Sequence, residues 1–320
     1  MSGRGLLYLI LRRLLVSFVL LVGISFLVFS LLDLAPGNAV TVLLGSRPRT
    51  PETIRALTHE YHLDKPFFTQ YWLWAKEAVQ LHFGNSVQTT LPVTDEITAR
   101  LPTTLFLGAY AFILTMISGI GLGVASALKR RTSVDRGIVA FASIGLSTPA
   151  FVSGVVLLYV FAILIPWFPV FGTGSGFFDE LWHLTLPAVA LAMVSAALVV
   201  KHTRAAMTSV LDQDYVIFAR ARGLSRRRVL FGYALRNALI PVATIGALTL
   251  AFVITGAVLV EVTFSLPGVG SLLVQSADTQ DLPMLQGVTM LMAAVIMGAN
   301  LLADLLYLAV DPRIRLGSQV

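Results

Sequence analysis

The sequence predicts an all-α membrane protein with about six transmembrane helices. Hydrophobic residues make up 56% of the 320-residue chain and charged residues 12%, whereas soluble domains average about 45–50% apolar and about 25% charged residues. The mean hydropathy is +0.82. Six apolar stretches also approach the roughly 20 residues that a helix needs to cross a hydrocarbon core about 30 Å thick. We therefore expect a multi-pass protein of the cell (inner or plasma) membrane.

The six predicted spans are separated by polar or basic segments. Their approximate limits are 14–32, 101–128, 137–167, 184–200, 238–262 and 285–310. The first span follows Arg4, Arg12 and Arg13, so a signal peptide is an alternative. Its apolar run is longer than the roughly 7–15 residues of a signal peptide's apolar region, and we interpret it as a retained span.

The short loops predict the orientation in the membrane. Loops 129–136 and 201–236 are rich in Lys and Arg, whereas loops 168–183 and 263–284 contain neither residue. Because cytoplasmic loops carry the excess of Lys and Arg, the first two loops are predicted to be cytoplasmic. With six spans, both termini are then cytoplasmic too. The net charge of +6 has the same explanation, and no nucleic-acid partner is expected.

This topology predicts four regions in the chain. They are a cytoplasmic N-terminus with the first span (1–32), an external helical cap (33–100), a core of five transmembrane helices with a cytoplasmic loop at 201–237 (101–310), and a cytoplasmic tail (311–320). In the cap, Thr50 can cap a helix that starts at Pro51. The sequence Asp64-Lys65-Pro66 then interrupts the pattern before a second helix over 67–81.

None of the motifs for hydrolytic chemistry is complete. The phosphate-binding sequence GxxxxGK[ST] needs a lysine after a glycine, and none of the four lysines follows one. His59-Glu60-Tyr61-His62 is one residue short of the zinc motif HExxH, so its histidines stand at i and i+3. There is no cysteine. The sequence therefore predicts no catalytic residue and no metal site, and the chain is not expected to be an enzyme.

Proline, glycine and hydroxyl residues mark particular points in the spans. Pro149 predicts a kink in the third span, where Ser147 and Thr148 can bond the carbonyl groups that it frees. The spacing of Gly119 and Gly123 predicts a close approach to another helix. The candidates for polar lining of a pathway are Ser143, Ser147, Thr148 and Ser195.

An ion-coupled secondary transporter or channel is one function that these observations leave open. Such a carrier places ionisable groups deep among its spans, where the cost of burying a charge implies a function. The candidates here are Glu261 and Asp304, which stand near the ends of the fifth and sixth spans. A membrane enzyme would need a polar catalytic cluster, for which the sequence offers no pattern.

The loop 201–237 is the segment that calls for a further explanation. After Asp214 the loop carries six arginines and no acidic residue. A short helix over 215–222 is predicted to end at Gly223, and Ser225 can cap the next helix. A loop that only sets topology needs nothing but charge, and it would also bind anionic lipid headgroups.

Small residues in this loop suit close docking in a groove of another protein. Ala219-Arg220-Ala221-Arg222-Gly223-Leu224-Ser225 resembles the coupling motif of the inner-membrane permease subunits of binding-protein-dependent ABC importers, of the dipeptide, oligopeptide and nickel type. Other segments that resemble this family are 31–36, 63–66, 83–86, 100–104, 147–149, 234–241, 261–270, 304 and 311–315. One departure is Phe218, which stands where the importers' motif begins with glutamate, so the salt bridge often attributed to that acid cannot be carried over.

The resemblance implies a type I ABC importer permease architecture and a set of partners. A second, homologous permease would complete the pathway, an external binding protein would deliver the substrate, and two ATPase subunits or domains, separate or fused, would bind ATP and Mg²⁺. This chain would bind no cofactor itself. The residues that the resemblance assigns to the ATPase-coupling loop are Tyr215, Ala219, Arg220, Ala221, Arg222, Gly223, Leu224 and Ser225. The family's substrates are dipeptides, longer peptides, nickel or glutathione, and peptides are the expected class.

Overall fold

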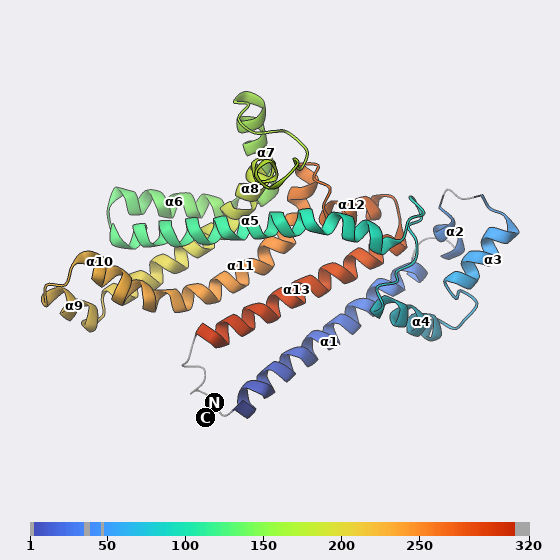
Figure 1. Cartoon of the computed structure of the whole chain (residues 1–320), viewed down its shortest axis with the longest axis horizontal. Coiled ribbons are helices and arrows are strands. Elements are labelled where there is room, and N and C mark those ends of the chain that lie inside the picture. Colours follow the sequence, from blue (N-terminus) through green and yellow to red (C-terminus); the bar gives the residue numbers. More distant parts are fainter. Residues whose placement is uncertain (1–2, 35–38, 46–47, 311–320) are drawn as a thin grey trace. The chain divides into compact units, whose positions relative to one another are not determined.

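Long helices dominate the computed structural model, which describes residues 3–34, 39–45 and 48–310 (Figure 1). The longest are α1 (Gly3–Leu34), α5 (Val93–Leu128), α8 (Phe177–Leu211), α11 (Arg236–Thr263) and α13 (Leu282–Val310). Within the described ranges, five helices are long and apolar enough to cross a membrane, or six if one bent pair counts as a single span. The predicted all-α membrane protein with about six spans is confirmed. The predicted tail at 311–320 lies outside the described residues.

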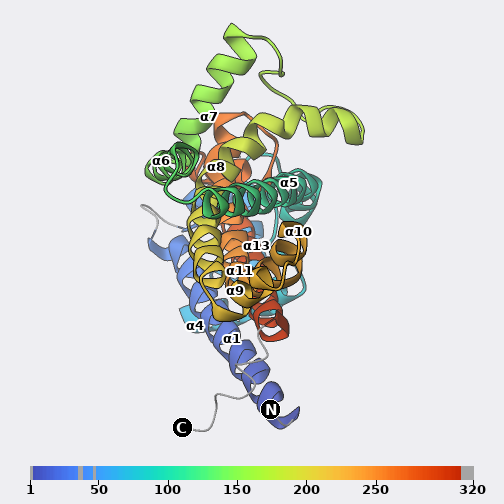
Figure 2. The same cartoon turned by 90° about the vertical axis from the view of Figure 1, so that its left-hand side faces the viewer.

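The third predicted span is broken into two arms. These arms are α6 (Ser133–Ser147) and α7 (Ala150–Leu158), the latter continuing as the π-helix η1 (Tyr159–Leu164). They meet at 106°, and Figure 2 shows α7 leaving the end of α6 at a steep angle. Pro149 starts the second arm with φ −57° and ψ 145°, an extended conformation that stops the first helix. The proline thus breaks this span, which is a larger effect than the predicted kink.

Hydroxyl groups complete the hydrogen bonding at the break. The Ser147 Oγ donates to the carbonyl oxygen of Ser143 at 3.0 Å, and the Thr148 Oγ1 donates to that of Ile144, also at 3.0 Å. Carbonyls in the last turn of a helix lack backbone partners, so these bonds stabilise the end of α6. Both side chains bond carbonyls as predicted, but these are the carbonyls of Ser143 and Ile144 and not that of Gly145, the residue four before Pro149.

Shorter helices form the segment predicted as a helical cap. They are α2 (Ala39–Leu44), α3 (Pro51–Glu60) and α4 (Phe67–Val79), and a further short helix, α12 (Val269–Asp278), precedes α13. As predicted, the Thr50 Oγ1 caps α3 by accepting a hydrogen bond from the Thr53 N–H at 3.1 Å. Helix α12 was not predicted.

The chain divides into two compact units. One unit holds residues 105–266 together with α13 from Ala299 onward. The other holds α1, the three cap helices, the start of α5, α12 and α13 up to Gly298. Helices α5 and α13 therefore each contribute to both units.

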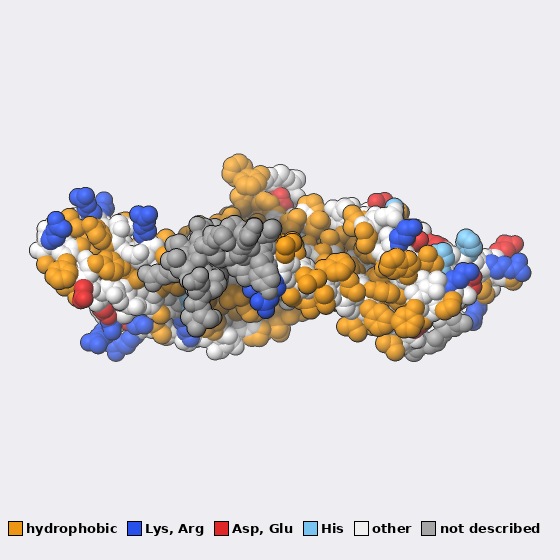
Figure 3. Space-filling view, turned by 90° about the horizontal axis from the view of Figure 1, so that it is seen from below, with side chains coloured by type: hydrophobic (Ala, Val, Ile, Leu, Met, Phe, Trp, Pro, Cys, Tyr) orange, Lys and Arg blue, Asp and Glu red, His pale blue; other side chains and the backbone are white. Residues whose placement is uncertain are grey.

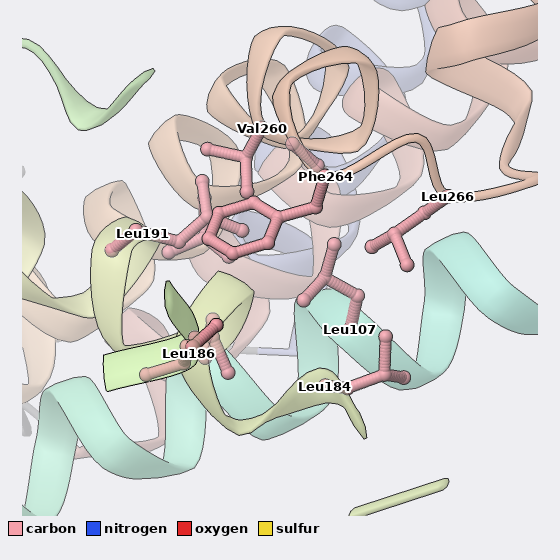
Figure 4. Close-up of a cluster of buried hydrophobic side chains, with 13 residues drawn as sticks. Leu107, Leu184, Leu186, Leu191, Val260, Phe264 and Leu266 are labelled. Carbon is pink, nitrogen blue, oxygen red and sulfur yellow. The ribbon is translucent and has the colours of Figure 1, made fainter. Parts of the chain in front are cut away.

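Helix α8 is the centre of the first unit. In its most apolar stretch 67% of the residues are buried, compared with 28% in α5 and in the fifth span. Leu186 and Leu191 of α8 pack with Leu107 of α5 and with Val260 and Phe264 at the end of α11 (Figure 4). In a bilayer such contacts stabilise the fold by van der Waals packing, because lipid tails are as apolar as leucine.

Gly119 and Gly123 bring α5 close to α8. A Cβ atom on Gly119 would lie 2.6 Å from the Cβ of Val199, and one on Gly123 would lie 2.5 Å from the Cβ of Thr203. Carbon atoms do not approach so closely, so only glycine fits at these two positions. The close helix approach predicted from the spacing of the two glycines is confirmed.

Replacing Gly123 by leucine should lower the stability of the first unit. Added volume in a packed contact costs about 1–3 kcal/mol, and here α5 would have to move away from α8. The midpoint of thermal unfolding in detergent measures the effect. Gly121→Leu is the matched control, because nothing lies within 4 Å of a Cβ at Gly121. Equal midpoints for the two variants would contradict the prediction.

Candidate functional site

The arginine-rich loop between α8 and α11 is an ordered helical element. After α8 ends, it contains α9 (Asp214–Ala221), the turn at Gly223, α10 (Arg226–Arg228) and the π-helix η2 (Val229–Leu235), which runs directly into α11. The predicted short helix, its end at Gly223 and the second helix that leads into the fifth span are all confirmed. The π-helical stretch was not predicted.

Two residues define the turn between α9 and α10. Gly223 has a φ of +74°, and its N–H donates to the carbonyl of Arg220 at 2.9 Å, which closes the helix with a left-handed residue. The Ser225 Oγ then accepts a hydrogen bond from the N–H of Arg228 at 3.4 Å and caps α10. The sequence therefore fixes the angle at which the two helices follow each other.

The loop has its own small hydrophobic core. Val216 and Ala219 on one face of α9 are buried against Val229 at the start of η2. In addition, the Asn237 Nδ2 donates a hydrogen bond to the Tyr215 hydroxyl at 3.1 Å, which ties the start of α9 to α11. The loop is thus packed against itself and against the fifth span rather than free to move independently.

The opposite face of α9 is exposed and apolar. Ile217 is 51% exposed and Phe218 67%, and Ala221 next to the turn is exposed as well. Exposed arginines surround these side chains, and Figure 3 shows Lys and Arg side chains gathered over the end of the molecule that α9 and α10 form. An apolar patch with a charged rim is typical of a protein–protein contact, in which aromatic residues and arginine are enriched.

The residues predicted for this contact lie in different environments. Ala219 is buried in the loop's own core, and Leu224 packs partly against it, so both support the loop from inside. Those on the surface are Tyr215, Arg220, Ala221, Arg222, Gly223 and Ser225. Ile217 and Phe218 belong to the exposed face but were not among the predicted residues. They stand between Val216 and Ala219 in the sequence, and the helical period places them on the side of α9 away from those two residues.

Asp135 connects the ends of three spans next to this loop. It lies in the first turn of α6 and is 4% exposed. Its carboxylate accepts two hydrogen bonds from the guanidinium of Arg204 in α8, at 2.7 and 2.8 Å, and one from the Ser126 Oγ of α5 at 2.5 Å. The N–H of Arg131 donates a fourth bond at 2.9 Å. Such bidentate, charge-assisted bonds hold the three helix ends in one arrangement.

A second contact joins the turn between α5 and α6 to the loop itself. The guanidinium of Arg130 lies 2.9 Å from the carboxylate of Asp212, which immediately follows α8. Both side chains are largely exposed. Nearby, Ala127, Met207 and Ala234 pack in a cluster that brings together α5, α8 and η2. The loop and the spans α5, α6 and α8 are therefore one connected structure, which the sequence alone did not predict.

The candidates for a polar pathway do not form a recognisable cluster on α6. Ser143 is half-buried, while the hydroxyls of Ser147 and Thr148 bond carbonyls of their own helix. Ser195 is buried in α8, 7% exposed. A role of these four residues in lining a pathway stays a prediction.

The other polar candidates lie in three different parts of the fold. Glu261 is completely buried near the end of α11. Asp304 lies in α13, and its side chain is outside the described part of the structure. His59 and His62 of the incomplete zinc motif lie at and just after the end of α3, and no group of three or more His, Cys, Asp or Glu residues suited to a metal occurs among the residues described.

The fold defines a multi-pass membrane protein, and comparison with known proteins identifies its family. Residues 119–316 match the family described as "binding-protein-dependent transport system inner membrane component", and residues 6–108 match its N-terminal part. The chain belongs to this family. It is thus a permease subunit of an ABC importer in the inner membrane, and not itself an enzyme, a channel or a secondary transporter.

Curated relatives match over nearly the whole chain. The oligopeptide transport system permease protein AppB of Bacillus subtilis is 40% identical, with 95% of this chain and 98% of that protein covered. The dipeptide transport system permease protein DppB of Escherichia coli K12 is 35% identical, with 96% and 98% covered. The di/tripeptide transport system permease protein DppB of Pseudomonas aeruginosa is 36% identical, with 92% and 94% covered.

Solved structures show the same fold at low sequence identity. An inward-facing structure of the MetNI methionine ABC transporter has a TM-score of 0.57 at 15% identity, with 68% of this chain and 96% of that chain covered. A crystal structure of an amino acid ABC transporter with histidines has a TM-score of 0.51 at 17% identity, covering 68% and 94%. The predicted type I ABC importer permease architecture is confirmed.

Proposed function

We propose that this chain and a second, homologous permease form the translocation pathway of a peptide importer. The named relatives are permeases of oligopeptide, dipeptide and di/tripeptide systems at 35–40% identity, which supports peptides as the substrate class. The loop 201–237 is this chain's contact with the ATPase. The whole importer has two ATPase subunits or domains, which bind ATP and Mg²⁺. No bond in the peptide is broken by this chain.

The observation that carries the coupling role is the two-sided construction of α9. One side is buried in the loop's own core, whereas Ile217, Phe218 and Ala221 are exposed on the other. A displacement applied to the exposed side therefore moves the whole element, and the contacts of Asp135 and Arg130 pass it to α5, α6 and α8. Rigid-body movement of these spans then alternates the access to the pathway.

This proposal fixes the orientation of the remaining regions. The arginine-rich loop faces the cytoplasm, as does the tail at 311–320, and both termini lie on that side. The cap at 33–100 and α12 are then external, where a substrate-binding protein docks. The division into residues 1–32, 33–100, 101–310 and 311–320 is part of the same proposal.

Phe218 gives the contact with the ATPase a different chemistry from a salt bridge. It occupies the position of the acidic residue in the importers' motif, and its ring is 67% exposed. A large aromatic side chain with arginines beside it is the usual composition of an energetic hot spot, in which the ring fills a pocket of the partner. We infer that Phe218 anchors this chain in an ATPase groove and that Arg220 and Arg222 surround the anchor.

Replacing Phe218 by alanine should separate the permease from the ATPase. Removing a hot-spot side chain costs about 2 kcal/mol or more, which is roughly a thirtyfold loss of affinity. Affinity purification from membranes in mild detergent, followed by mass spectrometry of the bound proteins, measures the loss. Replacing both Arg220 and Arg222 by glutamate should also lower the amount of ATPase that is recovered.

Phe218→Leu is the matched control, since it keeps an apolar side chain and should retain the ATPase. The second permease should be recovered with all variants, which shows that the membrane part is intact. Undiminished recovery of an ATPase with Phe218→Ala and with the double arginine variant would refute the coupling role of the loop. Family membership would be unaffected by that result.

A further inference from the structure

Helix α4 has one face that packs against the first span. The ring centroids of Phe67, Tyr71 and Trp74 lie 5.4, 5.6 and 5.5 Å from that of Phe29 in α1. The hydroxyl groups of Tyr71 and Ser25 are also hydrogen-bonded at 2.8 Å. These contacts fix both the position and the rotation of α4 beside α1.

A second face of α4 is apolar and exposed. Phe68 is 74% exposed, Trp72 69% and Val79 86%, and Ala75 completes the set. These residues stand at i, i+4, i+7 and i+11, which places them within a sector of about 60° on a helix of 3.6 residues per turn. We refer to Phe68, Trp72, Ala75 and Val79 as the apolar stripe. Figure 3 shows hydrophobic side chains gathered over the part of the molecule where α4 lies.

A third face of α4 is polar. Thr69, Lys76 and Glu77 are exposed, and Gln70 is half-buried. On a helical projection they lie on the side away from both the packing face and the apolar stripe. The helix thus shows three kinds of surface. One contacts α1, one is apolar with Phe68, Trp72 and Val79 exposed and Ala75 half-buried, and one suits water.

The depth of α4 along the first span follows from the sequence of α1. Phe29 stands 16 residues after Arg13, so it lies about 24 Å further along the helix axis. If Arg12 and Arg13 lie at one boundary of a hydrocarbon core about 30 Å thick, Phe29 lies close to the other boundary. Ser25, which bonds Tyr71 of α4, stands 12 residues after Arg13 and lies about 18 Å along the axis. Helix α4 therefore crosses α1 between the outer part of the hydrocarbon core and the headgroups.

We propose that α4 is an interfacial helix, which lies in the bilayer surface on the side of the cap with its apolar stripe among the lipids and its polar face in water. Its composition fits this place, since tryptophan and other aromatic residues are enriched at the boundary of the membrane. Helix α1 also exposes apolar residues, since Leu27 is 67% and Leu34 76% exposed. On the proposed topology this is the external leaflet.

The absence of cysteine from the chain allows a direct test by single-cysteine spin labelling. The variants are Phe68→Cys, Trp72→Cys and Val79→Cys on the apolar stripe, with Thr69→Cys and Lys76→Cys as matched controls on the same helix. The full chain, assembled with its partners, is placed in phospholipid nanodiscs. Continuous-wave electron paramagnetic resonance then compares the accessibility of each label to oxygen, which concentrates in lipid, and to the polar complex nickel(II) ethylenediaminediacetate.

The ratio of oxygen to nickel accessibility should be several-fold higher on the apolar stripe than at Thr69 and Lys76. Low accessibility to both reagents at the three stripe positions would overturn the proposal, because it would show a protein contact, such as one with the second permease. High accessibility to the nickel complex there would overturn it as well, because the stripe would face water. Since each variant carries one label, a variant that fails to assemble leaves two others to decide.

Discussion

Replacing Asp135 by asparagine is expected to lower the thermal stability of the chain more than any other single charge removal beside the arginine-rich loop. The change leaves the Arg204 guanidinium without its bidentate partner and weakens two further bonds, from Ser126 and from the Arg131 N–H. Arg131 also has a φ of +66°, an unfavourable conformation for a residue with a side chain, which the bond to Asp135 helps to hold. The Asp135 side chain is 6% and that of Arg204 32% exposed, so the loss comes mainly from the charge-assisted bonds to this carboxylate.

Asp212→Asn provides the comparison for this experiment. The pair of Arg130 and Asp212 has a donor–acceptor distance of 2.9 Å, close to the 2.7 and 2.8 Å between Arg204 and Asp135, but it is largely exposed. Exposed ion pairs contribute only about 0.2–1 kcal/mol. Thermal unfolding in the same detergent should therefore show a fall of several degrees for Asp135→Asn and little change for Asp212→Asn. If both variants unfold at the wild-type temperature, Asp135 does not hold the helix ends together.

Replacing Gly223 by valine should abolish peptide uptake while the ATPases continue to hydrolyse ATP. The site has room for a side chain, since nothing lies within 4 Å of a Cβ there, but its φ of +74° excludes a β-branched residue without strain of roughly 1–2 kcal/mol. The turn would relieve that strain by changing its backbone angles, which would tilt α9 and its exposed Phe218. Uptake of labelled peptide and ATP hydrolysis by reconstituted transporter measure the two activities.

Two variants separate this backbone effect from a general disturbance. Gly223→Asn should keep most of the uptake, because asparagine tolerates the left-handed conformation. Gly232→Val places the same side chain in η2, at a glycine without a positive φ and with open space around it. Normal coupling in Gly223→Val would show that the angle between α9 and α10 is not part of the mechanism.

The elements that the sequence predicted correctly depend on nearby residues or on overall composition. The cap of α3 at Thr50 and the turn from Gly223 to Ser225 are set within four residues, and the long spans are set by their apolar content. The break at Pro149 was predicted only as a kink, because a proline in a membrane helix gives either result, and the choice depends on what packs against each arm.

The features that were missed depend on contacts between distant residues. Asp135 and Arg204 are 69 positions apart, and nothing in either local sequence shows that they meet. Ala219 was interpreted as a docking residue because it is small, but its spacing from Val216 places both on the face that the loop buries. Placing the residues of α9 on a helix of 3.6 residues per turn would have separated the exposed Ile217 and Phe218 from the buried Val216 and Ala219.

The π-helix η2 has a consequence for the geometry of the transporter. Its wider turns hold more residues for the same rotation than an α-helix does, and they connect α10 to α11 without interrupting the helix. The rotation of the exposed face of α9 relative to the fifth span therefore depends on the number of residues in 229–235. Deleting one residue from this stretch would replace a wide turn by an α-helical turn. The change in rotation would be confined to η2, and the hydrogen-bond register within α10 and within α11 would stay as it is.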